Sequence, residues 1–315
     1  MMVPIGSVTR MHTQTLAASP ALTPLLARGA LLSPFKRPRR GGAVTPPTRL
    51  VLPGVRIDLA KLAAYERVCG YGVGADALPV TYPHVLGFPL AMRLMSARAF
   101  PLPLLGLVHT TVEIVQREAL PATGEYELHV YVEGLAPHRR GTEATLVTEA
   151  RGGGSLVWES RSTYLARHRT SQTSHRTSQT SQTSQTPQTS SAKAHAGPPP
   201  PPGEVRKTLP AMAEWRLGGD LGQRYGAASG DRNPIHLYPL TARLFGFRRP
   251  IAHGMWSVAR CLAEHGVPEA VYVKAEFRAP VLLPGVVTYA AKGGAFELRG
   301  EGERVHLTGE VRPLA

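Results

Sequence analysis

The chain contains two copies of one pattern, and this internal repeat constrains the fold more than any other feature of the sequence. Three pairs of segments match in the same order and at a nearly constant offset: YERVCGY (65–71) with YGAASGD (225–231), YPHVLGFPLAMRL (82–94) with RPIAHGMWSVARCL (249–262), and VEI…ALPATG (112–124) with AEF…LLPG (275–285). Each match is weak by itself. Their shared order predicts a duplicated domain.

A low-complexity segment separates the two copies. Residues 167–203 consist of Thr-Ser-Gln repeats that end in five consecutive prolines between two glycines. Such repeats cannot bury enough apolar surface to fold, and a proline run favours extended polyproline geometry. We therefore expect a disordered linker over 167–203 between a first half, 48–166, and a second half, 204–315.

Both halves predict the same coarse plan: a loop-rich opening, one helix and then several strands. In the second half, apolar residues at helical spacing predict a helix over 253–266, with Gly266 as its carboxy-terminal stop. The runs that follow are rich in β-branched residues and punctuated by Gly and Pro, as in VYVKAEF and VVTYAAK. One helix followed by an antiparallel meander predicts an α+β fold in which the sheet wraps around the helix.

Length and cysteine content narrow the class of protein. With 315 residues, of which 43% are apolar, the chain can form two domains with real cores. Cys69 and Cys261 lie far apart, and neither belongs to a CxxC pattern. We therefore expect no disulfide scaffold, no metal or redox centre at these cysteines, and a cytoplasmic location.

The formal net charge of +14 is partly carried by the amino-terminal segment. No acidic residue precedes Asp58, and FKRPRRGG occupies 35–42. We expect residues 1–47 to be a basic, flexible arm, with a transit peptide, a docking arm and a nucleic-acid-binding arm as open interpretations. No zinc-finger spacing or RNA-binding aromatic motif accompanies the charge, so we expect no nucleic-acid partner. The apolar segment 22–32 is too short and too interrupted to span a membrane.

The stretch SGDRNPIHLYP at 229–239 combines an acid, an amide and an imidazole with a proline. Pro234 disfavours helical geometry at Asn233 and is favoured at the first position of a helix. We therefore predict a turn, an extended Asp231, Asn233 as helix cap and His236 in the first helical turn. A carboxylate and an imidazole that face one point can hold and activate one water molecule. A capped helix whose Asp and His face solvent is the alternative.

Gly254 stands where the second-half helix is predicted to begin. Backbone N–H groups in the first turn of a helix have no partner within it, and a glycine lets a ligand approach the backbone closely. The N–H of Gly254 can thus polarise a carbonyl whose oxygen becomes negative. For His253 a capping or packing role is favoured over catalysis.

The segment YGAASGDRNPIHLYPLTARLFGFRRPIAHGM at 225–255 resembles the signature of the MaoC-like, R-specific enoyl-CoA hydratase family of hot-dog-fold proteins. The two motifs that carry the resemblance are D-x-N-P-x-H and, further on, P-I-A-H-G-M. The duplicated architecture is similar to that of the double hot-dog members, in which one half has lost the motif. In this chain the counterpart of Asp231 is Tyr71, and no Asn-Pro-x-His follows it.

The resemblance implies a tandem hot-dog fold and reversible hydration of a trans-2-enoyl thioester to a (3R)-3-hydroxyacyl thioester. By carry-over, Asp231 and His236 activate the water, Asn233 supports the loop and the N–H of Gly254 binds the thioester oxygen. Ser229, His253 and Met255 are the candidate substrate-binding residues. No metal and no other cofactor is implied, because the thioester is itself the substrate.

Three questions stay open at this level. The acyl carrier can be CoA or an acyl-carrier protein, and a non-catalytic acyl-CoA-binding or scaffold protein is an alternative to an enzyme. Because two hot-dog units already lie in one chain, either a monomer or a homodimer is expected. One residue departs from the family pattern: Tyr238 stands where an aspartate is common, directly before Pro239, and it is a poor helix cap.

Overall fold

The computed structural model describes residues 11–36, 45–168 and 208–314. Its helices are α1 (Leu22–Leu32), α2 (Leu59–Cys69), α3 (Tyr82–Ser96), α4 (Leu221–Ser229), α5 (Pro234–Leu237), α6 (Pro239–Leu244) and α7 (Gly254–His265), with short 3-10 turns at Ser33–Phe35 and Glu301–Glu303. Its strands are β1 (His12–Thr15), β2 (Thr48–Arg56), β3 (Leu107–Gln116), β4 (Glu125–His138), β5 (Gly141–Gly152), β6 (Ser155–Arg167), β7 (Ala211–Leu217), β8 (Val271–Phe277), β9 (Gly285–Lys292), β10 (Ala295–Arg299) and β11 (Val305–Pro313).

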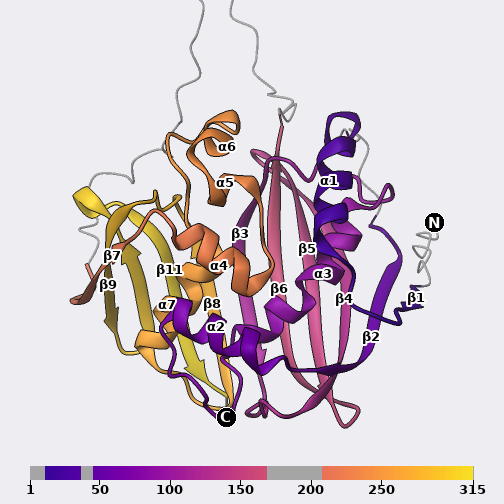
Figure 1. Cartoon of the computed structure of the whole chain (residues 1–315), viewed down its shortest axis with the longest axis horizontal. Coiled ribbons are helices and arrows are strands. Elements are labelled where there is room, and N and C mark those ends of the chain that lie inside the picture. Colours follow the sequence, from indigo (N-terminus) through magenta and orange to yellow (C-terminus); the bar gives the residue numbers. More distant parts are fainter. Residues whose placement is uncertain (1–10, 37–44, 169–207, 315) are drawn as a thin grey trace, which may run out of the picture. The chain divides into compact units, whose positions relative to one another are not determined.

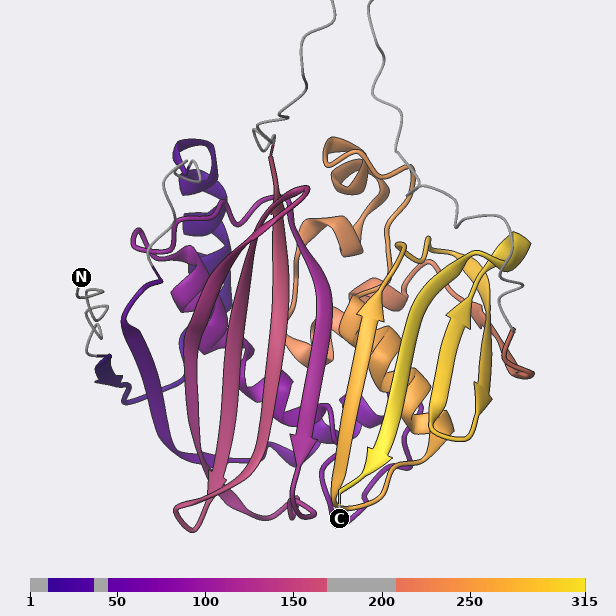
Figure 2. The ribbon, with the colours of Figure 1, turned by 180° about the vertical axis from the view of Figure 1, so that it is seen from behind.

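All described strands join one sheet, in the order β1-β2-β4-β5-β6-β3-β8-β11-β10-β9-β7. Every neighbouring pair is antiparallel except β1 and β2. Helices α3 and α7 lie against one face of this sheet, so that Figure 1 shows helices in front of strands and Figure 2 shows the strands in front. The α+β layout with one long helix in each half confirms the predicted tandem hot-dog fold.

The two copies of the repeat meet where β3 pairs with β8. Val112 is paired with Ala275, and these residues occupy the same position in the two copies. An antiparallel pair centred on equivalent residues is what a local two-fold relation between the copies requires. Lys274 Nζ lies 3.2 Å from Glu113 Oε1 beside this centre. The halves therefore share a continuous sheet.

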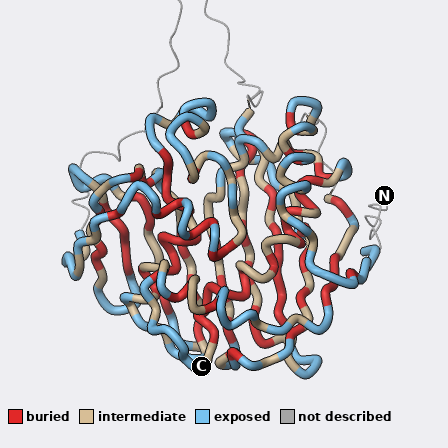
Figure 3. The backbone as a smooth tube through the Cα atoms, viewed as in Figure 1, coloured by how far each residue is buried: buried red, intermediate tan, exposed pale blue. Residues whose placement is uncertain are grey.

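The halves also share a core on the helical face. Tyr65 of α2 and Tyr225 of α4, aligned in the repeat, lie with ring centroids 6.0 Å apart. Trp256 of α7 donates from Nε1 to the carbonyl of Val68 in α2 at 2.8 Å. Both tyrosines and Trp256 are buried. Figure 3 shows buried residues concentrated where the helices face the strands.

Four elements lie in the openings that the sequence predicted to be rich in loops: β2 and α2 in the first half, and β7 and α4 in the second. Pro53 and Gly54 interrupt the pattern of β2, and β7 is short. Helix α4 contains two glycines, which lower helix propensity, and it is held by packing against α2 instead. Strand β10 was also not predicted separately.

The expected flexible arm is wrong for residues 11–36. Strand β1 pairs with β2, and α1 packs on α3. The hydroxyl of Ser33 donates to the carbonyl of Gly29 at 2.7 Å and accepts from the N–H of Leu105 at 2.9 Å. Gly29 is buried so closely against Leu104 that a Cβ there would lie 2.2 Å from its Cδ2. Apolar residues between the basic ones supply this packing; residues 1–10 and 37–44 lie outside the described part.

The predicted linker lies outside the described residues except for Arg167, which ends β6, and His168. Both cysteines are free and buried, as expected for a chain without a disulfide scaffold. In the three described ranges, no helix combines the length and apolarity that crossing a membrane requires.

Candidate active site

The loop between α4 and α5 has the predicted turn at Gly230, the predicted cap at Asn233 and His236 in the first helical turn. Helix α4 ends at Ser229 and is capped by Gly230, whose φ of 80° is the left-handed geometry that glycine accepts readily. Asp231 follows, and Asn233 caps α5 by accepting a hydrogen bond from the N–H of Ile235 at 3.4 Å. Pro234 is the first helical residue and His236 lies in the same turn. The proline thus bends the chain between the acid and the imidazole.

Two glycines of α4 allow this loop to lie directly on the helix. A Cβ at Gly222 would come 1.9 Å from the carbonyl oxygen of His236, and one at Gly226 would come 2.8 Å from that of Asp231. No side chain fits in either space. The sequence analysis did not identify these residues, although glycines spaced i, i+4 on a helix share one face and mark a close approach.

His236 is held by its Nδ1 atom, which lies 2.7 Å from the carbonyl oxygen of Ile251. Since a carbonyl only accepts, Nδ1 carries the proton and Nε2 is left as an acceptor. Burial lowers the pKa of His236 below its usual value, against the opposing influence of Asp231. The neutral ring therefore presents a basic nitrogen at neutral pH.

Asp231 is the acid of the pair. Its Oδ1 accepts the N–H of Asn233 at 3.2 Å, and its side chain keeps 26% of its surface exposed. Burial raises the pKa of Asp231 above the usual value, while His236 and the Asn233 N–H pull it down. A carboxylate that is costly to ionise in place is a better proton acceptor.

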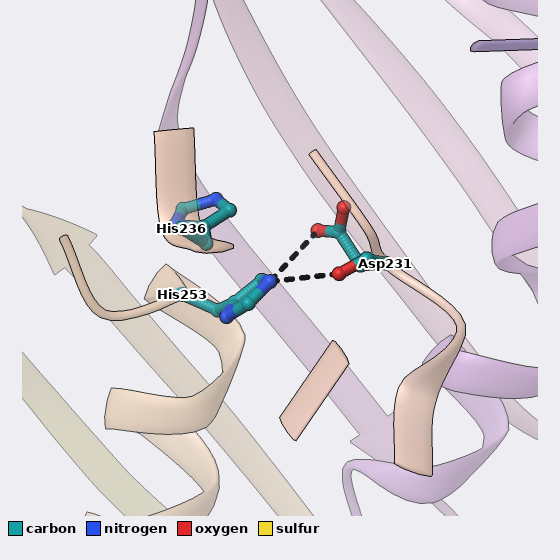
Figure 4. A group of neighbouring side chains, drawn as sticks. All are labelled: Asp231, His236 and His253. Carbon is teal, nitrogen blue, oxygen red and sulfur yellow. Dashed lines mark hydrogen bonds and ion pairs between the residues drawn. The ribbon is translucent and has the colours of Figure 1, made fainter. Parts of the chain in front are cut away.

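His253 contacts both Asp231 and His236. Its Nε2 donates to the backbone carbonyl of Asp231 at 2.9 Å and lies 3.9 Å from Asp231 Oδ2. Figure 4 draws both contacts as dashed lines. Its ring stacks on that of His236 with centroids 3.7 Å apart. Burial and the neighbouring His236 hold the pKa of His253 well below its usual value. These contacts place His253 as a support of the loop; its predicted contact with substrate stays a prediction.

The remaining predicted residues lie around this pair. Gly254 is the first residue of α7, as predicted, with His253 as the residue before it. Met255 is buried in the first turn of α7. Ser229 uses its hydroxyl internally, donating to the carbonyl of Tyr225 at 2.8 Å and accepting from the N–H of Asp231 at 3.2 Å. Roles for Met255 and Ser229 in binding substrate are untested by these contacts.

The first half contributes side chains next to the pair. Tyr164 of β6 lies close enough for the charge of Asp231 to raise the pKa of its hydroxyl, after burial. His109 of β3 stacks on Tyr164 with centroids 4.4 Å apart and lies 4.7 Å from Phe277 of β8. Phe277 in turn covers Gly254, where a Cβ would meet its ring at 2.8 Å. Tyr164, His109 and Phe277 lie far from residues 229–239 in the sequence, so no local sequence pattern could have assigned them to the site.

The corresponding loop of the first half carries no such pair. Tyr71, the counterpart of Asp231, is partly buried and its hydroxyl shares a hydrogen bond with Thr81 Oγ1 at 3.4 Å. Burial raises the pKa of Tyr71, so it stays neutral. The acid and the base are therefore confined to the second half.

Asp231, His236 and His253 offer ligand atoms that all lie within 4.8 Å of one another. A metal ion needs a nitrogen lone pair from each histidine. The Nε2 atom of His253 instead carries a proton, which it donates to the Asp231 carbonyl. The arrangement suits a water molecule held by two acceptors better than a metal ion.

The pKa shifts predict the acid limb of the pH profile. The carboxylate form of Asp231 is the one that accepts a proton, and its pKa is raised. Activity should therefore be present at neutral pH and be lost as pH falls through a midpoint above the usual range of an aspartate. The measurement is kcat/KM against pH; a midpoint at or below that range would contradict this role for Asp231.

Tyr238 allows a prediction on stability. It precedes α6 as N-cap, with extended geometry (φ −139°, ψ 147°) and no hydrogen bond from its side chain, and it is 55% exposed. Tyr238→Asp supplies an acceptor for the first turn and should stabilise the protein by about 0.5–2 kcal/mol. Denaturant unfolding measures this, with Tyr238→Ala as the control that supplies no cap. Equal stability of the two variants would contradict the capping argument.

The comparisons with known proteins agree with this geometry. A family model described as "MaoC like domain" matches residues 207–306. The chain is 36% identical over 265 residues to "3-hydroxyacyl-thioester dehydratase X" of Mycobacterium tuberculosis, an alignment that covers 82% of this chain and 86% of that protein. A crystal structure of HtdX from the same organism superposes with a TM-score of 0.68 at 31% identity, covering 84% of this chain and 100% of that one. A MaoC-like dehydratase from Phytophthora capsici shares the fold, with a TM-score of 0.63 at 18% identity over 86% and 96% of the two chains.

Proposed function

The chain belongs to the MaoC-like dehydratase family, and from this premise we propose that it adds water reversibly to a trans-2-enoyl-CoA to form a (3R)-3-hydroxyacyl-CoA. The observation that carries the proposal is that a carboxylate oxygen of Asp231 and a ring nitrogen of His236 lie within 4.8 Å of each other, while the bond from Nδ1 of His236 to the Ile251 carbonyl leaves Nε2 as an acceptor. A protein that only binds acyl-CoA has no need of two proton acceptors that share one water.

In the hydration direction, the two acceptors take the two O–H groups of one water molecule. As the oxygen bonds to C3, one proton passes to the acid–base pair, and the electron pair of the double bond moves onto the thioester oxygen. The N–H of Gly254, at the positive end of α7, stabilises this enolate. The pair then returns a proton to C2. Water is consumed and the residues are regenerated.

In this proposal the first half lines the acyl-binding pocket and supplies no catalytic group. Tyr164 and His109 belong to it and stand beside Asp231 and Phe277. The acyl chain beyond C3 would pass along them. We expect medium or long chains to be accepted, and a strict preference for four-carbon chains would contradict this part.

The test is turnover of purified protein with trans-2-enoyl-CoA substrates of several lengths, followed by loss of the conjugated enoyl absorbance. The configuration at C3 of the product is then determined by chiral analysis. The proposal expects the (3R) product. Binding of acyl-CoA without turnover would show a binding protein, and a (3S) product would overturn the stereochemical assignment.

A further inference from the structure

A cavity of about 590 Å³ lies beside the segment that follows α6, and it is lined by Arg243, Phe247, Arg248 and Arg249 together with Gly246. The backbone forms it by closing α6 with a Schellman turn. The N–H of Phe247 donates to the carbonyl of Ala242 and that of Gly246 to the carbonyl of Arg243, both at 3.0 Å. Gly246 takes the left-handed φ of 83° that this turn requires. We call this the α6 cavity.

The arginines of the α6 cavity are exposed and lack carboxylate partners. Among the described residues, no carboxylate lies within 4 Å of Arg243, Arg248 or Arg249, and Arg249 donates to the carbonyl of Pro284 at 2.9 Å. The sequence from 232 to 263 contains no acidic residue. Figure 3 shows the α6 region as mostly exposed. Three positive charges are thus gathered without compensation on their own segment.

A second cavity of about 370 Å³ provides the contrast. It is lined by Arg216, Arg224 and Arg260, among others. Each of these arginines lies within 4 Å of a carboxylate: Glu214, Asp220 and Glu264, respectively. The fourth arginine of this lining, Arg67, has no carboxylate within 4 Å among the described residues, so three of the four cations are paired. A cation that is already paired gains less from an anionic ligand. The α6 cavity, whose three arginines all lack such a partner among the described residues, therefore favours an anion more strongly.

In the sequence, the residues that line the α6 cavity lie between His236 on one side and Ile251 and His253 on the other. Helix α6 directly follows α5, which carries His236. Arg249 precedes by two residues Ile251, whose carbonyl orients His236. It is four residues from His253, which limits their Cα separation to about 14 Å. An anion bound there could therefore belong to the same molecule as the reacting thioester.

We propose that the α6 cavity binds the phosphorylated adenosine end of CoA. Arginine guanidinium groups bind phosphate oxygens with two parallel hydrogen bonds, and Phe247 offers an aromatic face for the adenine. The inference rests on the proposed function, because it needs CoA to be the carrier of the acyl group. It assigns carrier recognition to Arg243, Arg248 and Arg249, none of which takes part in the chemical step.

The test compares two substrates with one acyl group: crotonyl-CoA and crotonyl-pantetheine, which lacks the nucleotide. In Arg243→Ala/Arg248→Ala the KM for crotonyl-CoA should rise about tenfold to hundredfold, with kcat within about twofold, since charged hydrogen bonds to phosphate are lost. Kinetics with crotonyl-pantetheine should not change. The matched control is Arg216→Ala/Arg224→Ala, which should leave both substrates unaffected.

A second measurement does not depend on catalysis. Adenosine 3′,5′-bisphosphate should bind the wild-type protein in calorimetry, more weakly as ionic strength rises, and should not bind the Arg243→Ala/Arg248→Ala variant. An unchanged KM for crotonyl-CoA, or retained nucleotide binding, would overturn the inference while leaving the hydratase proposal intact. If the variant instead impaired only an acyl-carrier-protein substrate, the surface would receive a carrier protein. Failure of the wild-type protein to turn over these thioesters and the longer trans-2-enoyl-CoA substrates would point to the proposed function itself.

Discussion

Asp231→Asn should lower kcat for hydration of an enoyl thioester by about 10²–10⁴, and His236→Asn should do the same. The first substitution keeps an oxygen for the Asn233 N–H, and the second keeps a donor for the Ile251 carbonyl. Each variant thus removes a proton acceptor while the loop retains its hydrogen bonds. Steady-state kinetics with crotonyl-CoA measures the effect.

The double variant sharpens this test. If both groups act on one water molecule, Asp231→Asn/His236→Asn should be little slower than either single variant, because residues that act as a unit are not additive. Losses that multiply would show two independent roles. Asp220→Asn, at an exposed carboxylate of the same half, is the control and should keep full activity.

The stability of Asp231→Asn separates chemistry from folding. Since the pKa of Asp231 is raised in the folded protein, its ionised form is disfavoured there at neutral pH. The neutral amide removes this cost, so the variant should unfold at the same or higher denaturant concentration than the wild type at pH 7. A clear loss of stability would mean that lost activity reports misfolding.

Gly222→Ala is expected to have the second large effect, although this glycine touches no substrate. Its new Cβ would lie 1.9 Å from the carbonyl oxygen of His236, which is backbone and cannot rotate away. The loop must shift by an ångström or more, and a displacement of about 1 Å at a reacting group can lower the rate by about 10². We expect kcat to fall by about that factor, together with a loss of stability.

Gly72→Ala is the matched control for Gly222→Ala. Gly72 belongs to the loop after α2, in the first half, and nothing lies within 4 Å of the Cβ it would carry. The same chemical change should there leave kcat unchanged. If Gly222→Ala were as active as Gly72→Ala, the close contact between α4 and the loop would not position His236.

The local order of residues was enough to predict the shape of the catalytic loop. Pro234 restricts Asn233 and itself starts a helix, so a bend between Asp231 and His236 follows from these residues alone. The pattern of one helix followed by strands likewise predicted the α+β layout, and comparison of the two copies showed Tyr71 as the counterpart of Asp231 in the first half. Such features depend on neighbours along the chain or on patterns compared directly within the sequence.

The sequence did not identify the residues from other segments that contact or influence the loop. The proton on Nδ1 of His236 depends on a carbonyl at Ile251, and Tyr164, whose pKa the charge of Asp231 raises, comes from the other half. The order of residues 11–36 was also missed, because the arm was judged by its lack of acidic residues and by the basic run at 35–42. Only Arg28 and Lys36 are Lys or Arg within 11–36, and a few buried apolar contacts decide the packing of this segment.

The sequence by itself thus predicted the fold class, the duplication and the placement of Asp231 and His236 on either side of one bend, because backbone restrictions of proline and glycine and the spacing of apolar residues act locally. Only the tertiary structure decided which nitrogen of His236 is free, how closely α4 approaches the loop and where the unpaired arginines gather. These depend on distances between segments that the spacing of residues along the chain does not contain.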